Sequence, residues 1–275
     1  MLLSELQKKI TKILAEGGIE TNSLDARIIL KEIFNFDEKE LILNSDLILS
    51  ESKISKVQKI ITRRLNFEPV SKIFGKRDFY NSTFSISDDV LDPRPETENI
   101  VEIANNFILE KGYESFIDLG TGSGCIILSI LKENKNLTAV GVDISIDAIN
   151  IAKKNSKDMK LEKRSSFLVS NWLSSIYSSY DLIISNPPYI PSDEIITLSK
   201  TVKNFDPLIS LDGGQDGLKC YKEIAQDINR VINKNGRVIL EIGYNQAHDV
   251  IKIFESKEFK LLKIYNDING LNRIL

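Results

Sequence analysis

The sequence is poor in the residues that most often build metal centres, disulfides and nucleophilic active sites. Its 275 residues include two cysteines, Cys125 and Cys220, and one histidine, His248. A zinc site made of Cys and His takes about four ligands, so no metal centre is expected. A Ser-His-Asp or Cys-His mechanism would need His248, which lies in the helical pattern "NQAHDVIKIFE" and is interpreted as an exposed helical residue. Two cysteines do not suggest a disulfide framework, and Cys125 is expected to be a small core residue, which fits a reducing cytoplasm.

Long apolar runs and an excess of positive charge are also missing. No apolar run approaches the roughly 20 residues that span a bilayer, so no membrane contact is expected. There are 36 Lys and Arg against 39 Asp and Glu, which gives a net charge of −3. A near-balanced chain has no general basic footprint, which disfavours a protein that grips duplex DNA through its phosphates. The length allows one large domain or two, with a sizeable core.

Residues 1 to about 72 are predicted to form a small helical module. Asn22 or Ser23 is the candidate N-cap of its second helix. The adjacent pair Arg63 and Arg64 is interpreted as a solvated helix face and not as a binding patch. Three segments carry apolar residues at helical spacing: "LLSELQKKITKILAEGG", "NSLDARIILKEIFNF" and "SESKISKVQKIITRRLNFEP".

The hydrophobic period changes after this module. "RDFYNSTFSISDDVL" nearly alternates apolar and polar residues around a turn at Asn81-Ser82, which predicts a β-hairpin within residues 75–95. Beyond it, strand-like segments alternate with helical ones, which predicts a parallel α/β sheet with right-handed crossovers. The last strands, after residue 260, are expected to form a hairpin at one end of the sheet. The strand candidates are "SFIDL", "TAVGVDI", "SSFLVS", "YDLIISN", "GRVILEIG" and "KLLKIYND", and the helical runs include 124–133, 146–155 and 217–233.

A glycine-rich turn lies between a buried strand and an apolar helix in "FIDLGTGSGCIILSIL". Gly120, Gly122 and Gly124 allow a tight turn and a close backbone approach by a ligand, and the helix start supplies unpaired N–H groups. An acidic residue, Asp143, ends the next strand about 20 positions on, where a carboxylate can accept hydrogen bonds from a ribose diol. The alternative is a plain strand-to-helix turn that uses glycines for packing.

A second rigid element follows another strand, in "IISNPPYIPS". Pro187 and Pro188 fix the backbone and remove two donors, so Asn186 to Tyr189 must end the strand stiffly. In a doubly wound sheet, ligands bind beyond the carboxyl ends of the strands, so this element and the glycine turn are expected at the same edge. The alternative, a proline strand stop, explains the prolines but not the Asn and the Tyr beside them.

The D-x-G-x-G-x-G spacing, which starts at Asp118, resembles motif I of the class I S-adenosylmethionine-dependent methyltransferases. Together with Asn-Pro-Pro-Tyr, it resembles enzymes that methylate a planar amino group, namely N(6)-adenine and protein glutamine-amide methyltransferases. The resemblance implies a Rossmann-like class I methyltransferase domain with a mostly parallel twisted sheet. The cofactor it implies is S-adenosyl-L-methionine, with S-adenosyl-L-homocysteine as product. The cofactor contacts it implies are Gly120, Thr121, Gly122, Ser123, Gly124, Asp143, Trp172 and Asn186.

"DPRPETE" (92–98) directs the resemblance to one family. With "EPVSKIFGKRDFY", "LDGGQDGL" and "LEIG", it is similar to the peptide chain release factor glutamine methyltransferases of the HemK/PrmC type, over nearly the whole chain. The implied substrate is the glutamine of the Gly-Gly-Gln loop of class 1 release factors. The implied organisation is a helical substrate-recognition domain (1–74), a β-hairpin linker (75–95) and a methyltransferase domain (96–275). A cytoplasmic monomer without specific nucleic-acid binding is expected.

The same resemblance gives roles to the Asn-Pro-Pro-Tyr element. The Asn186 side-chain carbonyl and the Pro187 backbone carbonyl would accept the two N–H groups of the substrate amide. Tyr189 would pack its ring on the amide plane, and Pro188 would complete the substrate contact. Trp172 would flank the adenine ring of the cofactor, with ordinary packing as the alternative.

Several points stay open at this stage. Arg94, Glu96 and Glu98 are consistent with a polar helix start near the cofactor. Thr97 and Glu98 lie in the first turn of that helix, where a capping role is the alternative. Asp92 departs from a position that is often apolar in the family, and Gly213-Gly214-Gln215 is interpreted as a loop and not as a self-methylation site. An N(6)-adenine or other nucleic-acid methyltransferase and a ribosomal-protein glutamine methyltransferase remain the alternative enzymes, and a cofactor-binding module without catalysis is the non-enzymatic one.

Overall fold

Two units make up the protein in the computed structural model, which describes residues 1–275. The first comprises Met1–Gly75 together with Ser199–Phe205, and the second comprises Lys76–Leu198 and Asp206–Leu275. The assignment of Ser199–Phe205 to the first unit was not expected, because a short polar segment carries no sequence signal of the helices it packs with.

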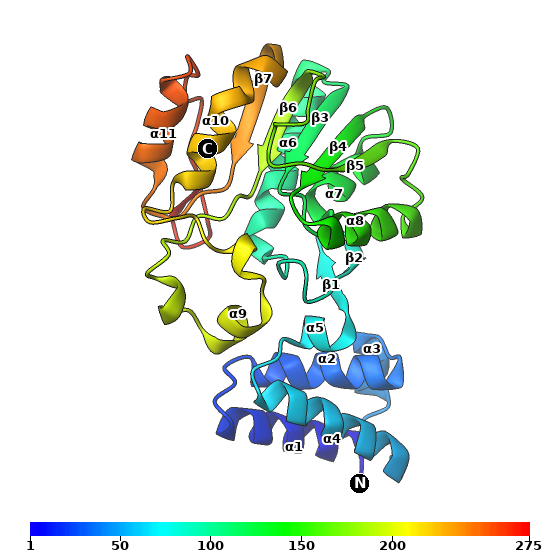
Figure 1. Cartoon of the computed structure of the whole chain (residues 1–275). Helices are drawn as coiled ribbons and strands as arrows, with labels where there is room; N and C mark the ends of the chain where they lie inside the picture. The colour runs from blue at the N-terminus through cyan, green and yellow to red at the C-terminus, as the bar shows by residue number, and fades with distance from the viewer. The chain divides into compact units, whose positions relative to one another are not determined.

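The first unit is helical, as predicted (Figure 1). Its core is apolar and includes Ile10, Leu14, Ile29 and Val57, which come from three different helices. The predicted N-cap of α2 is wrong by one residue, since the cap is Thr21, whose hydroxyl donates to Asp25 Oδ2 at 2.8 Å. The helices are α1 (Leu3–Glu16), α2 (Asn22–Phe34), α3 (Glu38–Leu43), α4 (Glu51–Leu65), α5 (Val70–Phe74) and α9 (Lys200–Phe205).

Arg64 corrects the expectation of a solvated arginine pair. Its side chain is buried, and its Nε donates to Asp25 Oδ2 at 2.7 Å in a buried ion pair between α4 and α2. Arg63, beside it, pairs with Glu68 at the surface. Successive residues of a helix point about 100° apart, so one of two adjacent arginines can enter the core while the other stays outside.

The second unit opens with the predicted hairpin, formed by β1 (Lys76–Phe79) and β2 (Ser82–Ser85). Phe79 pairs with Ser82, so the turn is Tyr80-Asn81, one residue before the predicted position. Tyr80 takes the left-handed conformation there, with φ of 51°. Phe79 and Phe84 bury their rings edge to face, and this packing sets which residues of the hairpin face inward.

A five-stranded parallel sheet forms the centre of this unit, in the order β5-β4-β3-β6-β7. The chain therefore winds outward from β3 in one direction through β4 and β5, then returns to β6 on its other side. This reversal makes the boundary between β3 and β6 the topological switch point of the sheet, where such folds bind ligands. The strands are β3 (Ser115–Leu119), β4 (Thr138–Asp143), β5 (Ser165–Val169), β6 (Tyr180–Ser185) and β7 (Ile232–Leu240).

Helices cover both faces of the sheet, so the sheet has two apolar cores (Figure 1). Alternate residues of β3 divide between them, with Phe116 on the side of α6, α7 and α8, and Ile117 on the side of α10 and α11. Cys125 is buried at the start of α7 and His248 is exposed on α11, as predicted. The helices are α6 (Glu98–Lys111), α7 (Cys125–Glu133), α8 (Ile146–Asp158), α10 (Lys219–Val231) and α11 (Ala247–Glu255).

The C-terminal hairpin is shorter than predicted. β8 comprises Tyr265–Asn266 and pairs with β9 (Asn272–Ile274), while residues 260–264 are irregular. The chain end still reaches the sheet, because Leu240 and Leu275 exchange two backbone hydrogen bonds of 3.0 Å. None of the helices combines the length and the apolar character needed to cross a bilayer.

Candidate functional site

The glycine turn and the Asn-Pro-Pro-Tyr element begin at neighbouring positions of the sheet. Leu119, the last residue of β3, pairs in register with Ser185, the last residue of β6. Ser185 Oγ also donates to Leu119 O at 2.8 Å, which fastens the two strand ends together. Gly120 and Asn186 follow these residues directly, so both elements lie at the same edge of the sheet, as the sequence predicted, and this edge position is the switch point.

The glycine turn is held open by its own backbone and by a buried acid. Gly120, Gly122 and Gly124 have φ of 73°, 53° and 78°, a region that favours glycine. A Cβ on Gly122 would meet no atom within 4 Å, so open space lies over this part of the turn. Asp118, fully buried beneath it, accepts a hydrogen bond of 2.7 Å from Thr121 Oγ1, and burial raises the pKa of Asp118 to about 7. The hydrogen bond from Thr121 to Asp118 therefore helps to hold the glycine turn in its conformation.

Asp143 ends β4 beside this turn. Its Oδ2 accepts from the Gly122 N–H at 2.9 Å, and its Oδ1 accepts from the Ser145 N–H at 2.9 Å. Burial raises the pKa of Asp143, while hydrogen bonds from backbone N–H groups oppose that rise. A carboxylate offers about four acceptor positions, so Asp143 keeps capacity for a ribose hydroxyl. The chemistry and placement of these residues fit a nucleoside cofactor.

Trp172 lies against the glycine turn. Its ring passes 3.5 Å from the position that a Cβ on Gly120 would take, so the indole and the turn face each other closely. Its Nε1 donates to Glu223 Oε2 of α10 at 2.8 Å, and its backbone has φ of 48°. Trp172 also packs on the core on the α10 and α11 side, which means that packing and cofactor contact are compatible roles. No motif in the sequence pointed to its partner Glu223.

Asn186 is oriented through its side-chain nitrogen. Its Nδ2 donates to Thr97 Oγ1 at 3.2 Å, and Thr97 Oγ1 donates to Glu241 Oε2 at 2.7 Å. Asn186 Oδ1 and the Pro187 carbonyl oxygen accept no hydrogen bond from the chain. Two unused acceptors therefore lie on consecutive residues at the strand end.

Gln246 holds the backbone at the end of the Asn-Pro-Pro-Tyr element through hydrogen bonds. Its Nε2 donates to Tyr189 O at 2.8 Å and to Gly217 O at 3.2 Å, and its Oε1 accepts from the Gly243 N–H at 2.9 Å. A Cβ on Gly213 would come within 2.8 Å of Tyr189 Cα, so this position must be glycine for the loop to pack so closely. Burial raises the pKa of the Tyr189 hydroxyl, with the Glu241 carboxylate contributing, which keeps the phenol neutral.

Gln246 and Glu241 were not predicted as site residues. Gln246 lies in the pattern interpreted only as a helix, and Glu241 lies in the quoted "LEIG" without a role. A glutamine or glutamate at the end of a buried strand could have indicated a site residue, because a buried polar side chain needs hydrogen-bond partners.

The segment before α6 is tied to a distant loop. Arg94 Nη2 donates to Asp206 Oδ2 at 2.6 Å, and the Asp92 N–H donates to Asp206 Oδ1 at 3.1 Å. Asp92 is buried and lies 3.6 Å from Arg77 Nε, so charged partners accommodate the acid at a position that is often apolar. Thr97 makes no side-chain capping bond to η1 (Pro95–Thr97) or α6, which argues against a capping role for its hydroxyl.

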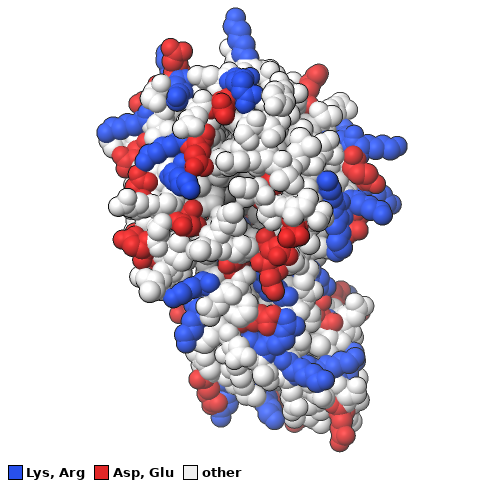
Figure 2. Space-filling view, in the orientation of Figure 1, with Lys and Arg blue, Asp and Glu red and all other residues white.

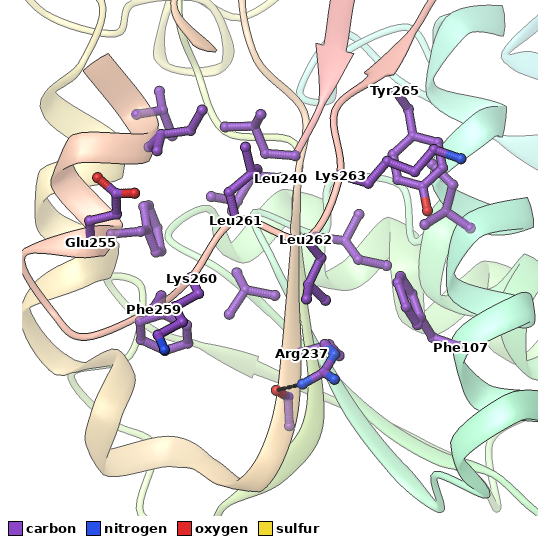
Figure 3. A pocket seen from close by; sticks show the side chains of 18 of the residues that line it. Phe107, Arg237, Leu240, Glu255, Phe259, Lys260, Leu261, Leu262, Lys263 and Tyr265 are labelled. Atoms are coloured by element: carbon purple, nitrogen blue, oxygen red, sulfur yellow. Dashed lines mark hydrogen bonds between the residues drawn. The ribbon is translucent and has the colours of Figure 1, made fainter. Parts of the chain in front are cut away.

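A cavity of about 400 Å³ lies elsewhere, along the edge strand β7 (Figure 3). Apolar side chains such as Phe107 of α6, Leu240 of β7, Phe259 and Leu262 line it, and none of the site residues does. It lies where residues 260–264 fail to extend the sheet, so it is a packing gap at the sheet edge and not the candidate site.

Acidic and basic side chains are interspersed on the face that Figure 2 shows, around a broad uncharged area. The chain has no group of three or more His, Cys, Asp or Glu side chains arranged to hold a metal ion.

The sheet order, the glycine turn and the acid at the end of β4 define an α/β methyltransferase domain of class I. A family described as "Methyltransferase small domain" matches residues 101–203, and one described as "PrmC N-terminal domain" matches residues 5–75. The fold is similar to the hMettl16 catalytic domain solved with the MAT2A 3′UTR hairpin 1, with a TM-score of 0.56, 13% identity, and coverage of 90% of this chain and 88% of that one.

Similarity to curated proteins indicates the family within this class of methyltransferases. The chain is 37% identical to the release factor glutamine methyltransferase of Agrobacterium fabrum, over 96% of this chain and 93% of that protein. It is 35% identical to the protein of that name from Caulobacter vibrioides, over 95% and 91%. A bifunctional methyltransferase of Rickettsia felis is 34% identical, and the match there spans 56% of the longer relative. The chain belongs to the family of the release factor glutamine methyltransferases.

Proposed function

We propose that the protein transfers a methyl group from S-adenosyl-L-methionine to the side-chain amide nitrogen of the glutamine in the Gly-Gly-Gln loop of class 1 release factors. The observation that carries this proposal is the pair of unused acceptors, Asn186 Oδ1 and Pro187 O, beside the glycine turn. Family membership supports the substrate, because the relatives' name specifies a release factor glutamine. We expect the protein to act in the cytoplasm as a monomer.

The geometry of the turn supports a set of proposed cofactor contacts. The backbone from Gly120 to Gly124, with the open space at Gly122, would approach the methionine part, and Asp143 would accept the ribose hydroxyls. Trp172 would flank the adenine, held in place through Glu223. When bound, S-adenosyl-L-methionine supplies an electrophilic methyl group on a positively charged sulfur.

The chain's own contribution to the reaction is to orient a poor nucleophile. An amide nitrogen has little reactivity because its lone pair is delocalised into the carbonyl. Hydrogen bonds from its two N–H groups to Asn186 Oδ1 and Pro187 O would fix its direction and favour pyramidalisation during attack. Holding reactants in line can lower a barrier by roughly 7–11 kcal/mol. Pro187 and Pro188 make the acceptor backbone stiff, and Tyr189 would cover the amide plane.

The N-terminal module is the proposed recognition domain. Residues 1–74 would contact the release factor, residues 75–95 would link the domains, and residues 96–275 would carry the reaction. The match of residues 5–75 to the PrmC N-terminal domain supports this division over that of a nucleic-acid methyltransferase.

The test is methyl transfer from radiolabelled S-adenosyl-L-methionine to a class 1 release factor. The matched control is the same factor with its loop glutamine replaced by alanine, and a ribosomal protein and DNA serve as competing acceptors. Label on the release factor and none on the alanine variant is expected. Equal label on both, or label on DNA, would show that the acceptor is different.

A further inference from the structure

Thr97 has a hydroxyl whose single proton is already committed. A threonine hydroxyl has one proton to donate and two lone pairs to accept with. This proton is donated to Glu241 Oε2, at 2.7 Å. An ionised carboxylate has no proton of its own, so Glu241 can only accept in this short hydrogen bond. Toward Asn186, at 3.2 Å, Thr97 can therefore only accept.

This direction decides which end of the Asn186 amide faces the chain. A hydroxyl that can only accept selects the NH2 end, and the Glu241 carboxylate, which also interacts with the Asn186 side-chain amide, selects the same end. The oxygen Oδ1 must then point away from both. We infer that Thr97 and Glu241 are positioning residues that set the orientation of the Asn186 amide, so that an oxygen and not an NH2 group meets the substrate. This inference rests on the proposed function.

The surroundings hold Glu241 in the required place. Its backbone N–H donates to Ser185 O at 2.9 Å, which puts it next to the residue that precedes Asn186. Its carbonyl accepts from Tyr221 Oη of α10 at 2.8 Å. Thr97 and Glu241 are only 3% and 4% exposed, so water does not compete for their hydrogen bond.

The charges around the pair bear on its ionisation. Burial disfavours the Glu241 carboxylate and raises its pKa. The hydrogen bond from Thr97 and the charge of Arg273 of β9 favour the carboxylate, and Glu96 of η1 opposes it. Tyr189 and Tyr221 face it as neutral phenols whose pKa values are raised by burial. If Glu241 lost its acceptor oxygen, the Thr97 proton would be released to turn toward Asn186, and the amide could then reverse.

The test uses Thr97→Val, which keeps the side-chain shape and removes the hydroxyl, with Thr97→Ser as the conservative variant. Glu241→Leu is a second, independent variant that removes the acceptor and leaves no buried charge. Ser156→Ala is the matched control, because it deletes a buried hydroxyl bond, to Ser165 Oγ at 2.7 Å, at the amino end of the sheet. Each protein is assayed for turnover on the release factor, for affinity for S-adenosyl-L-homocysteine by calorimetry, and for the side-chain amide proton shifts of Asn186 by nuclear magnetic resonance.

Thr97→Val and Glu241→Leu should each lower kcat by about 10- to 100-fold, the range that a small misplacement of a reacting group produces. Their affinity for S-adenosyl-L-homocysteine should stay within about twofold of the parent, Thr97→Ser should recover most of the turnover, and Ser156→Ala should leave kcat unchanged. Unchanged kcat in Glu241→Leu, or loss of cofactor affinity in step with kcat, would overturn the inference. The amide shifts of Asn186 should move in both variants without any substrate, so unmoved shifts overturn it even if the parent protein methylates a different acceptor.

Discussion

Replacing Glu241 with Gln should change the pH dependence of folding stability. Burial raises the pKa of Glu241 from 4.5 to about 7, against the opposing bonds from Thr97 and Asn186 and the charge of Arg273. Each pKa unit corresponds to 1.36 kcal/mol, so the buried carboxylate is disfavoured relative to its neutral form by about 3 kcal/mol. Because the folded pKa lies above the unfolded one, the native state binds more protons between these values. Stability from this group is therefore complete below about pH 4.5 and is lost as pH rises through about 7.

The Gln side chain has no charge to lose, and its carbonyl can still accept from Thr97. Urea unfolding of the parent and of Glu241→Gln should be measured at pH 5 and at pH 8.5. The variant should gain about 2.5 kcal/mol relative to the parent between the two pH values, because part of the contribution is already lost at pH 5, whatever constant cost its NH2 group adds. Asp118 and Asp143 titrate in both proteins, so their effects cancel in the difference. A stability difference that is the same at both pH values would refute the buried, pKa-shifted carboxylate.

Three further substitutions test other parts of the structure. Asn186→Ala should lower kcat by about 10²- to 10³-fold in the methyl-transfer assay and leave cofactor affinity nearly unchanged, since one oriented polar group is lost in the transition state; unchanged turnover would rule out its carbonyl as an acceptor. Asp143→Ala should instead weaken cofactor binding by about 10- to 100-fold in calorimetry, because charged hydrogen bonds contribute about 1.5–3 kcal/mol; unaltered affinity would contradict the ribose assignment. Arg64→Met should destabilise the first unit by about 3–5 kcal/mol in urea, because Asp25 is left buried and unpaired; adding Asp25→Leu should recover most of that loss, and a cost that persists in the double variant would mean that packing, not charge, is responsible.

The parts of the site that could be predicted are those written in consecutive residues. The glycine turn, Asp143 and the Asn-Pro-Pro-Tyr element each follow a strand, and parallel strands deliver their carboxyl ends to one edge. The prediction that these strands are parallel was therefore enough to predict that the three elements lie at one edge of the sheet. The prediction did not depend on strand lengths, and errors such as the early start of β7 at Ile232 did not affect it.

Contacts between distant segments could not be predicted. Thr97 and Glu241 are 144 positions apart, and nothing local to "PETE" or "LEIG" requires that they meet. The same holds for Arg64 and Asp25, because a helical period places Arg64 on a face but does not say which helix covers that face. Residues 260–264 were misjudged for a related reason: apolar character favours a strand, but a strand also needs a partner edge, and most of this segment has none.

Asn186 depends both on a local motif and on contacts between distant segments. The motif identifies the residue, but an asparagine side chain has an acceptor at one end and a donor at the other, and the motif does not say which end faces the substrate. For an amide substrate that offers two N–H groups, only the oxygen end is useful. The choice is made by a threonine 89 positions away, whose own proton is held by Glu241. The chemical polarity of the site is therefore set by the tertiary structure around the motif, and substitutions outside the motif should be able to disable it without touching the cofactor.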